Sequence, residues 1–233
     1  MAAEPPGGLV RSRFTCGSSE VDVITDAPTV VALTELSSPF FQCAPSNPGD
    51  SVVPLVWAIE RPPVGHGWEQ LSFSSATEPD RVVWANHTRR QVAIVAAPSA
   101  WRTQQLLRSV RNLIRWQAYA RGELFLHGGM VVVDGVGIAF LGQKRAGKTS
   151  NILSALVNAS ADFVSNDDLV VVSATDGVIG QGCPRAITVR IDSLMAVTKH
   201  DQRLRALLDT VSHPINHHRK QESLTVSSNA RSR

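Results

Sequence analysis

The sequence predicts a mixed α/β protein whose N-terminal part is rich in β-strands. Between residues 14 and 97, short apolar runs alternate with clusters of Pro, Gly, Asn and Asp, a pattern typical of strands joined by turns. Two longer stretches, 101–121 and 148–158, carry apolar side chains at helical spacing. The 233 residues, 43% of them hydrophobic, are enough for one large domain or two small ones.

Composition and charge exclude several classes of protein. The net charge of +3 gives no reason to expect nucleic acid or a membrane surface as the main partner. The first 25 residues contain no apolar signal segment, and no later run is long enough to span a membrane, so we expect a cytoplasmic protein. The three cysteines, Cys16, Cys43 and Cys183, are far apart and show no C-x-x-C spacing, so we expect reduced thiols.

The N-terminal part divides into a short start and a β-rich region. Residues 1–13 are rich in Pro, Gly and Arg, and we expect them to be disordered. The β-rich region then covers residues 14–98. Its apolar runs predict strands at 21–25, 29–36, 51–59, 81–85 and 91–97. Tryptophans among these strands are expected as core anchors, because large aromatic side chains between strands usually pack in the core.

A helix is predicted at 101–121 and begins the third region, residues 99–233. Ser99 is a suitable N-cap, and Gly122 follows the last helical position. Arg108, Arg111 and Arg115 share one face of this helix. We expect that face to be solvated, with an acidic partner as the alternative.

The next stretch combines a tight hairpin with a phosphate-binding motif. The dipeptide Asp134-Gly135 suits a type I′ turn between the apolar runs 130–133 and 136–141. The second run leads into Gly-Gln-Lys-Arg-Ala-Gly-Lys-Thr at 142–149, which fits the pattern G-x-x-x-x-G-K-[ST]. In such a loop the glycines let backbone N–H groups face the phosphates, the Lys reaches the β- and γ-phosphates, and the Thr hydroxyl binds Mg²⁺.

An acidic pair follows the predicted helix 148–158. Asp167 and Asp168 stand inside the apolar run 163–172, which we expect to form a strand. Adjacent carboxylates repel each other in a core, but a bound cation compensates them. Further on, we expect a strand at 186–191 and a helix at 193–211. The three histidines after that helix are not expected to bind metal, because Pro214 breaks any helix that would align them.

The order of these motifs resembles the HPr kinase/phosphorylase family, which has a phosphoenolpyruvate-carboxykinase-like core. The resemblance rests on His127, the Asp134-Gly135 hairpin, the phosphate loop and the acidic pair, within residues 100–191. It implies transfer of phosphate from ATP or GTP, with Mg²⁺, to a hydroxyl of a peptide or protein Ser or of a small molecule. The chain looks more like the small kinases of biosynthetic clusters in this family than like its sugar-regulatory member.

The resemblance also implies a role for each site residue. His127 would lie beside the γ-phosphate, and Lys148 would neutralise charge on the transferred group. Thr149 and Asp167 would hold Mg²⁺, while Asp167 or Asp168 would orient or deprotonate the acceptor hydroxyl. The nucleotide would be cradled by Gly142, Gln143, Lys144, Arg145, Ala146, Gly147, Lys148, Thr149 and Ser150.

The sequence leaves several alternatives open. Counting from Lys148 places the acid pair of the family near 165–167, so either Asn166 or Asp167 takes the base position. An Asn there removes proton abstraction, which keeps open a nucleotide-binding regulatory or scaffold module without transfer. A simple NTPase, the identity of the acceptor and a homo-oligomer also stay open. The segment that binds the protein acceptor in this family has no clear match here.

Overall fold

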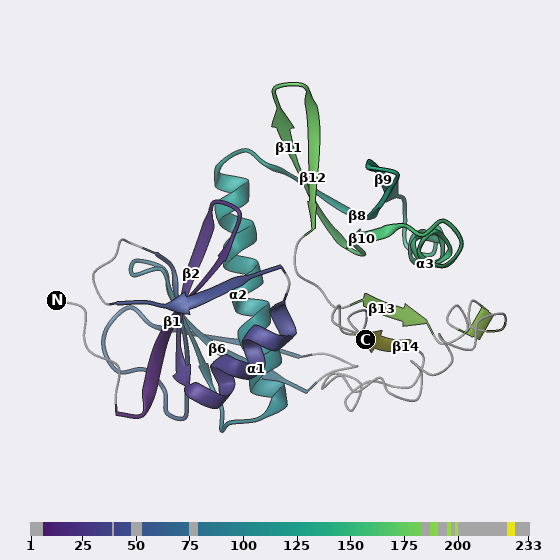
Figure 1. Ribbon diagram of the computed structural model, residues 1–233. Coiled ribbons are helices and arrows are strands. Elements are labelled where there is room, and N and C mark those ends of the chain that lie inside the picture. Colours follow the sequence, from purple (N-terminus) through teal and green to yellow (C-terminus); the bar gives the residue numbers. More distant parts are fainter. Residues whose placement is uncertain are drawn as a thin grey trace. The chain divides into compact units, whose positions relative to one another are not determined.

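The computed structural model describes two compact units, Met1–Ala118 and Tyr119–Arg233 (Figure 1). Both units contain strands and helices, so the predicted mixed α/β class is confirmed. Within the described part of the chain, no helix is long and apolar enough to cross a membrane. The described residues are 7–38, 40–47, 53–74, 79–182, 187–190, 195–196, 199 and 223–226.

The N-terminal unit is built on a seven-stranded sheet with the order β3-β1-β2-β4-β7-β6-β5. Strand β4 pairs in parallel with β2 and with β7, and the other neighbours are antiparallel. The strands are β1 (Leu9–Cys16), β2 (Ser19–Asp26), β3 (Gln42–Pro45), β4 (Leu55–Ile59), β5 (Glu69–Phe73), β6 (Arg81–Asn86) and β7 (Gln91–Val95).

Two helices, α1 (Ala27–Ser37) and α2 (Ala100–Ala120), pack with this sheet into one core. Strand residues of the core alternate along β2 and β4, so they come from one face of the sheet. The amphipathic pattern of α2 predicted its apolar face correctly. The largest members of the core are Phe14, Leu33, Phe41, Val56, Leu106, Val110 and Ile114.

The predicted strand at 29–36 is wrong, because this stretch lies in helix α1. Its Thr and Val residues favour a strand by propensity. A strong helix start outweighs that propensity. Asp26 is the N-cap and accepts a hydrogen bond from the Thr29 backbone N–H at 2.9 Å, and Pro28 stands in the first turn, where its missing N–H costs nothing.

The start of the chain and the boundary between units also differ from the expectation. Strand β1 begins at Leu9, inside the stretch 1–13 that was expected to be disordered, because pairing with β2 orders it. The units divide after Ala118 instead of residue 98. The reason is that α2 packs its apolar side chains into the core of the N-terminal sheet.

The C-terminal unit contains a five-stranded antiparallel sheet and helix α3 (Lys148–Asn158). Strand β8 is central: it pairs with β9 on one side and with β10 and then β11 on the other, and β12 pairs with β11 (Figure 1). Helix α3 packs on this sheet through Val131, Ile152 and Ala161. The strands are β8 (Leu124–Val133), β9 (Val136–Leu141), β10 (Asp162–Ser165), β11 (Asp168–Ala174) and β12 (Gly177–Gly182).

The hairpin predicted before the phosphate loop is confirmed. Asp134 and Gly135 join β8 to β9 with φ angles of 49° and 80°, both positive as a type I′ turn requires. A separate two-stranded sheet pairs β13 (Ile187–Arg190) with β14 (Ser223–Val226). Except for residues 195, 196 and 199, the helix predicted at 193–211 lies outside the described residues, as do Cys183 and the three C-terminal histidines.

Candidate functional site

The phosphate motif forms the connection between β9 and α3. Gly142 follows the last residue of β9 with a φ of 153°, and Gly147 is the N-cap of α3 with a φ of 82°. These positive φ angles explain the glycines, because an L side chain is strained there. A Cβ on Gly142 would also come within 3.0 Å of the Ala146 Cβ. Arg145 has a φ of 71°, so the loop holds one non-glycine residue in the left-handed region.

The N-terminus of α3 faces the inside of this loop without a capping side chain. Gly147 makes no side-chain cap hydrogen bond, and the first intrahelical bond runs from the Asn151 N–H to the Gly147 carbonyl at 2.9 Å. The backbone N–H groups at the start of a helix have no partner within the helix. Together with the helix dipole, they make this end a favourable place for a phosphate group.

The Lys148 side chain folds back across the loop. Its Nζ donates hydrogen bonds to the carbonyl oxygens of Gly142 at 2.7 Å and Gln143 at 3.0 Å. The ammonium group therefore lies beside the loop backbone. Lys144 and Arg145 are exposed in the same loop, so three cationic residues lie within residues 144–148, at and just before the start of α3.

The Thr149 hydroxyl contacts Asn166. Thr149 Oγ1 donates to Asn166 Oδ1 at 3.1 Å, and Asn166 is only 1% exposed. Nδ2 of the same amide is buried and has no hydrogen-bond partner among the residues that the structure describes. Of the two residues that the sequence left open, Asn166 is therefore the one whose side chain meets the Thr149 hydroxyl.

The predicted single strand at 163–172 is interrupted at Asn166 and Asp167, which separate β10 from β11. Both strands pair with β8, and the register shifts between Phe163 and Ser165. The Gly128 N–H donates to the Asp167 carbonyl at 3.2 Å, and Ser165 Oγ donates to the Asp168 carbonyl at 2.5 Å. These two hydrogen bonds hold the backbone in place where the chain passes from β10 to β11.

Gly128 and Gly129 make this close approach possible, and the sequence analysis missed them. A Cβ on Gly129 would lie 2.2 Å from Ile152 Cδ1 and 2.8 Å from the Ser165 carbonyl oxygen. A Cβ on Gly128 would lie 2.8 Å from the Phe140 carbonyl oxygen. The signal was present in the sequence, because glycine inside a strand pattern often marks a close approach of backbone.

The predicted catalytic residues His127 and Asp168 are direct partners in the β8–β11 pairing. Directly opposite residues point to the same face of a sheet, so these two side chains share a face. His127 is exposed, whereas Asp168 is 5% exposed. The next residue of β8, Gly128, pairs with Leu141, the last residue before the loop. The structure thus brings the predicted His, the acidic pair and the phosphate loop to one end of β9.

The donors available for Mg²⁺ are oxygen atoms, the type that this ion prefers. Thr149 supplies a hydroxyl and Asp167 a carboxylate. In the described part of the chain, no three His, Cys, Asp or Glu side chains cluster in a way that would hold a metal by themselves. Such a cluster is not needed for a nucleotide-bound Mg²⁺, which takes one or two protein ligands and completes its shell with phosphates and water.

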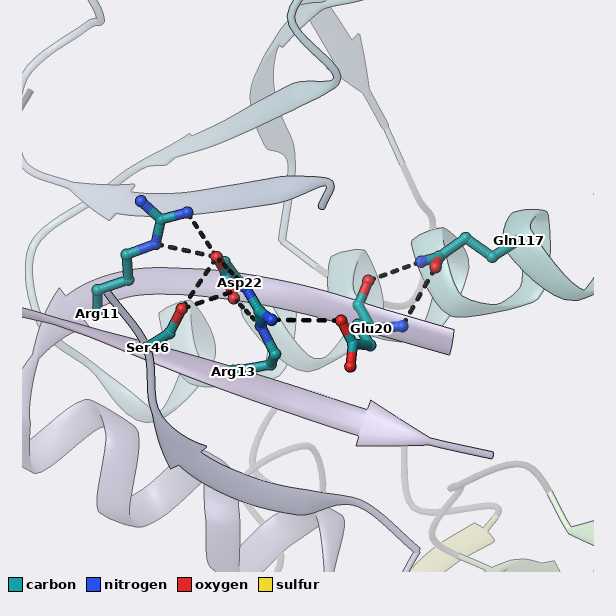
Figure 2. Close-up of polar contacts among 6 residues, drawn as sticks. All are labelled: Arg11, Arg13, Glu20, Asp22, Ser46 and Gln117. Atoms are coloured by element: carbon teal, nitrogen blue, oxygen red, sulfur yellow. Dashed lines mark hydrogen bonds and ion pairs between the residues drawn. The ribbon is translucent and has the colours of Figure 1, made fainter. Parts of the chain in front are cut away.

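A second charged cluster lies in the N-terminal unit (Figure 2). The Asp22 side chain is fully buried and accepts hydrogen bonds from Arg11 Nη2 at 2.5 Å, Arg13 Nε at 2.8 Å and Ser46 Oγ at 3.2 Å. Burial alone would raise the pKa of Asp22, but the hydrogen bonds from Arg13 and Arg11 outweigh it and hold the pKa below its ordinary value of 3.8. The cluster is therefore charged and paired.

A hollow of about 250 Å³ adjoins this cluster and is lined by residues of β1 and β3 and by Ser46, which follows β3. Arg13 is the cationic residue in its wall, and its guanidinium group already binds Asp22 and Glu20. The charges are thus matched inside the protein, which favours a structural role. Sequence reasoning missed the cluster, because the pairing of Arg13 with Asp22 depends on the register of β1 and β2.

The C-terminal unit thus combines exposed cationic residues in the loop, a helix start without a side-chain cap and two acidic residues near them in the sheet. The sequence matches no protein-family model and no curated protein.

Proposed function

We propose that the chain is a phosphotransferase that moves a phosphoryl group from ATP, or GTP, to a hydroxyl of a peptide or protein Ser or of a small molecule. One observation carries the proposal. A glycine loop with Lys148 folded across it leads into a helix whose N-terminus has no capping side chain. This geometry suits the phosphates of a nucleotide, because a helix N-terminus and a cation lie in the same short loop.

The residues of the loop would bind and orient the phosphates. Backbone N–H groups of residues 142–150 would donate to phosphate oxygens, and Lys148 would neutralise charge that builds on the transferred group. Mg²⁺ bound with the nucleotide would neutralise further phosphate charge, and Thr149 and Asp167 are the residues proposed to hold it. Stabilisation of this kind is the main protein contribution to phosphoryl transfer.

The acceptor would approach from the side of His127, Asp167 and Asp168. A carboxylate there would orient the acceptor hydroxyl or take its proton. His127 is exposed and lies opposite Asp168, so its side chain is accessible to a ligand on this face of the sheet. Phosphoryl transfer needs little proton removal in a loose transition state, so positioning of the hydroxyl would matter more than basicity.

The test is transfer from γ-labelled ATP to Ser-containing peptides and small alcohols, with and without the Lys148→Ala substitution. We expect Mg²⁺-dependent labelling of an acceptor and its loss, by at least about a hundredfold, in Lys148→Ala. Lys199→Ala is the matched control, because Lys199 is an exposed lysine outside the loop and its replacement should leave labelling unchanged. Equal labelling by wild type and Lys148→Ala would contradict the proposal.

A nucleotide-binding regulatory module is the second candidate, and the contact between Thr149 and Asn166 favours it. An amide takes no proton at neutral pH, so the side chain beside the Thr149 hydroxyl does not act as a base. This candidate predicts tight ATP binding without transfer or hydrolysis across the acceptor panel, and no change in Asp168→Asn. Release of phosphate without an acceptor would instead identify a simple NTPase.

A further inference from the structure

The amide of Asn166 occupies the place next to the Thr149 hydroxyl. In nucleotide sites built on a phosphate loop, an Asp and the loop Ser or Thr commonly hold Mg²⁺ together. Here Oδ1 of a neutral side chain accepts a hydrogen bond from the Thr149 hydroxyl, with 3.1 Å between the two oxygen atoms. The contact fixes the orientation of the hydroxyl without placing a negative charge there.

The charged side chains of the loop itself, residues 142–149, are all cationic and favour an anion. Lys148 lies across the loop, and Lys144 and Arg145 are exposed within it. A carboxylate beside a triphosphate repels it unless a cation lies between them, because two like charges about 4 Å apart interact by several kcal/mol near a protein surface. A neutral amide produces no such repulsion. The protein cations at this site therefore have no carboxylate at position 166 to offset them.

The nitrogen of the Asn166 amide favours an anion nearby. Nδ2 of Asn166 is a buried donor without a partner among the described residues. A buried, unsatisfied N–H group leaves its positive end uncompensated, at a cost of about 1–3 kcal/mol. A nearby anion lowers that cost and a nearby cation raises it. Nδ2 thus favours phosphate charge, and Oδ1 is engaged by the Thr149 hydroxyl.

We propose that Asn166 is a positioning residue that makes nucleotide binding at this loop only weakly dependent on Mg²⁺. Asn166 holds the Thr149 hydroxyl, and Lys144, Arg145, Lys148 and the backbone N–H groups supply the charge that binds the triphosphate. This inference rests on the proposed nucleotide site. It concerns the affinity for the nucleotide, and it holds for a phosphotransferase and for a binding module.

The experiment compares ATP binding to the full chain in EDTA and in Mg²⁺ by isothermal titration calorimetry. For the wild type we expect the two dissociation constants to agree within about threefold. For Asn166→Asp we expect at least about tenfold weaker binding in EDTA, with recovery in Mg²⁺, because the new carboxylate faces the phosphates. Asn112→Asp adds the same charge at an exposed position of α2 and should behave like the wild type.

The outcomes separate this inference from the proposed function. Wild-type binding that appears only with Mg²⁺ would overturn the inference and leave the kinase proposal standing. The inference would also be overturned if wild-type ATP binding depends strongly on Mg²⁺ and Asp167→Asn removes this dependence. Asp167 would then be the residue that holds the cation, and the kinase proposal would still stand. Absence of ATP binding in both buffers would overturn both proposals, and binding without transfer would overturn only the kinase. The wild-type comparison needs no variant, so it decides the question even if Asn166→Asp does not fold.

Discussion

The two charged regions of this protein satisfy their charges in opposite ways. In the N-terminal unit, the buried Asp22 is held by Arg11 and Arg13 and by Ser46 (Figure 2). In the C-terminal unit, Lys144 and Arg145 are exposed, and the start of α3 has no capping side chain. A cluster whose charges are paired internally contributes to folding. A cluster whose donors are left for an external anion is suited to binding.

The largest expected effect comes from breaking the paired cluster. Asp22→Ala leaves Arg11 and Arg13 partly buried without their carboxylate, and we expect the unfolding free energy to fall by about 3–5 kcal/mol. All five tryptophans lie at or before residue 116, so tryptophan fluorescence in a urea titration reports on the N-terminal unit. Glu20→Ala is the matched control, because Glu20 is a half-exposed partner of Arg13 and its loss should cost less than about 1 kcal/mol. Equal losses of unfolding free energy in Asp22→Ala and Glu20→Ala would show that the buried charge of Asp22 contributes no more to stability than the half-exposed charge of Glu20.

A smaller effect is expected from crowding the backbone beside the loop. In Gly129→Ala the new Cβ meets Ile152 and the Ser165 carbonyl, so β8 and the break between β10 and β11 move apart. We expect a loss of about 1–3 kcal/mol in the C-terminal unit, seen as faster hydrogen exchange in β8, together with weaker ATP binding. Tryptophan fluorescence should be unchanged. Gly7→Ala, where a Cβ has open space, is the control.

These two regions also show how far the sequence was informative. The Asp134-Gly135 turn and helix α3 are local patterns in which a few neighbouring residues determine the backbone, and the sequence predicted both elements at their observed places. The contact between Thr149 and Asn166 was beyond prediction, because it depends on where β10 ends and on the register shift beside β8.

The N-terminal unit was harder to predict, because its structure depends on long-range pairing. The run 29–36 has the composition of a strand, but a local N-cap at Asp26 and Pro28 in the first turn start a helix there. The ion pair of Asp26 with Arg102 of α2 adds a contact from far along the chain. The pairing of Arg13 with Asp22 follows from the β1–β2 register. The Asp26–Arg102 and Arg13–Asp22 pairs depend on tertiary structure and strand register, whereas the pattern G-x-x-x-x-G-K-[ST] lies within eight consecutive residues.

The smallest expected effect is a loss of stability of the N-terminal unit at acidic pH, caused by protonation of its paired carboxylates. Burial alone would raise the pKa of Asp26, but hydrogen bonds from Thr29 and the Arg102 guanidinium outweigh it and hold the pKa below the ordinary value of 3.8, as they do for Asp22 with its arginines. A carboxyl group with a lowered folded-state pKa stabilises the protein above its unfolded pKa, and this contribution is lost as the pH falls through the folded pKa.

The urea midpoint from tryptophan fluorescence should therefore be nearly constant from pH 7 to about pH 5 and should fall below about pH 4. Asp26→Asn is the informative variant, because an Asn still caps α1 but no longer titrates beside Arg102. It should lower the midpoint at neutral pH and reduce the fall in acid. A fall of the same size in Asp26→Asn and in the wild type would mean that the acid sensitivity has another source, and that the pairing between α1 and α2 adds little to the stability of this unit.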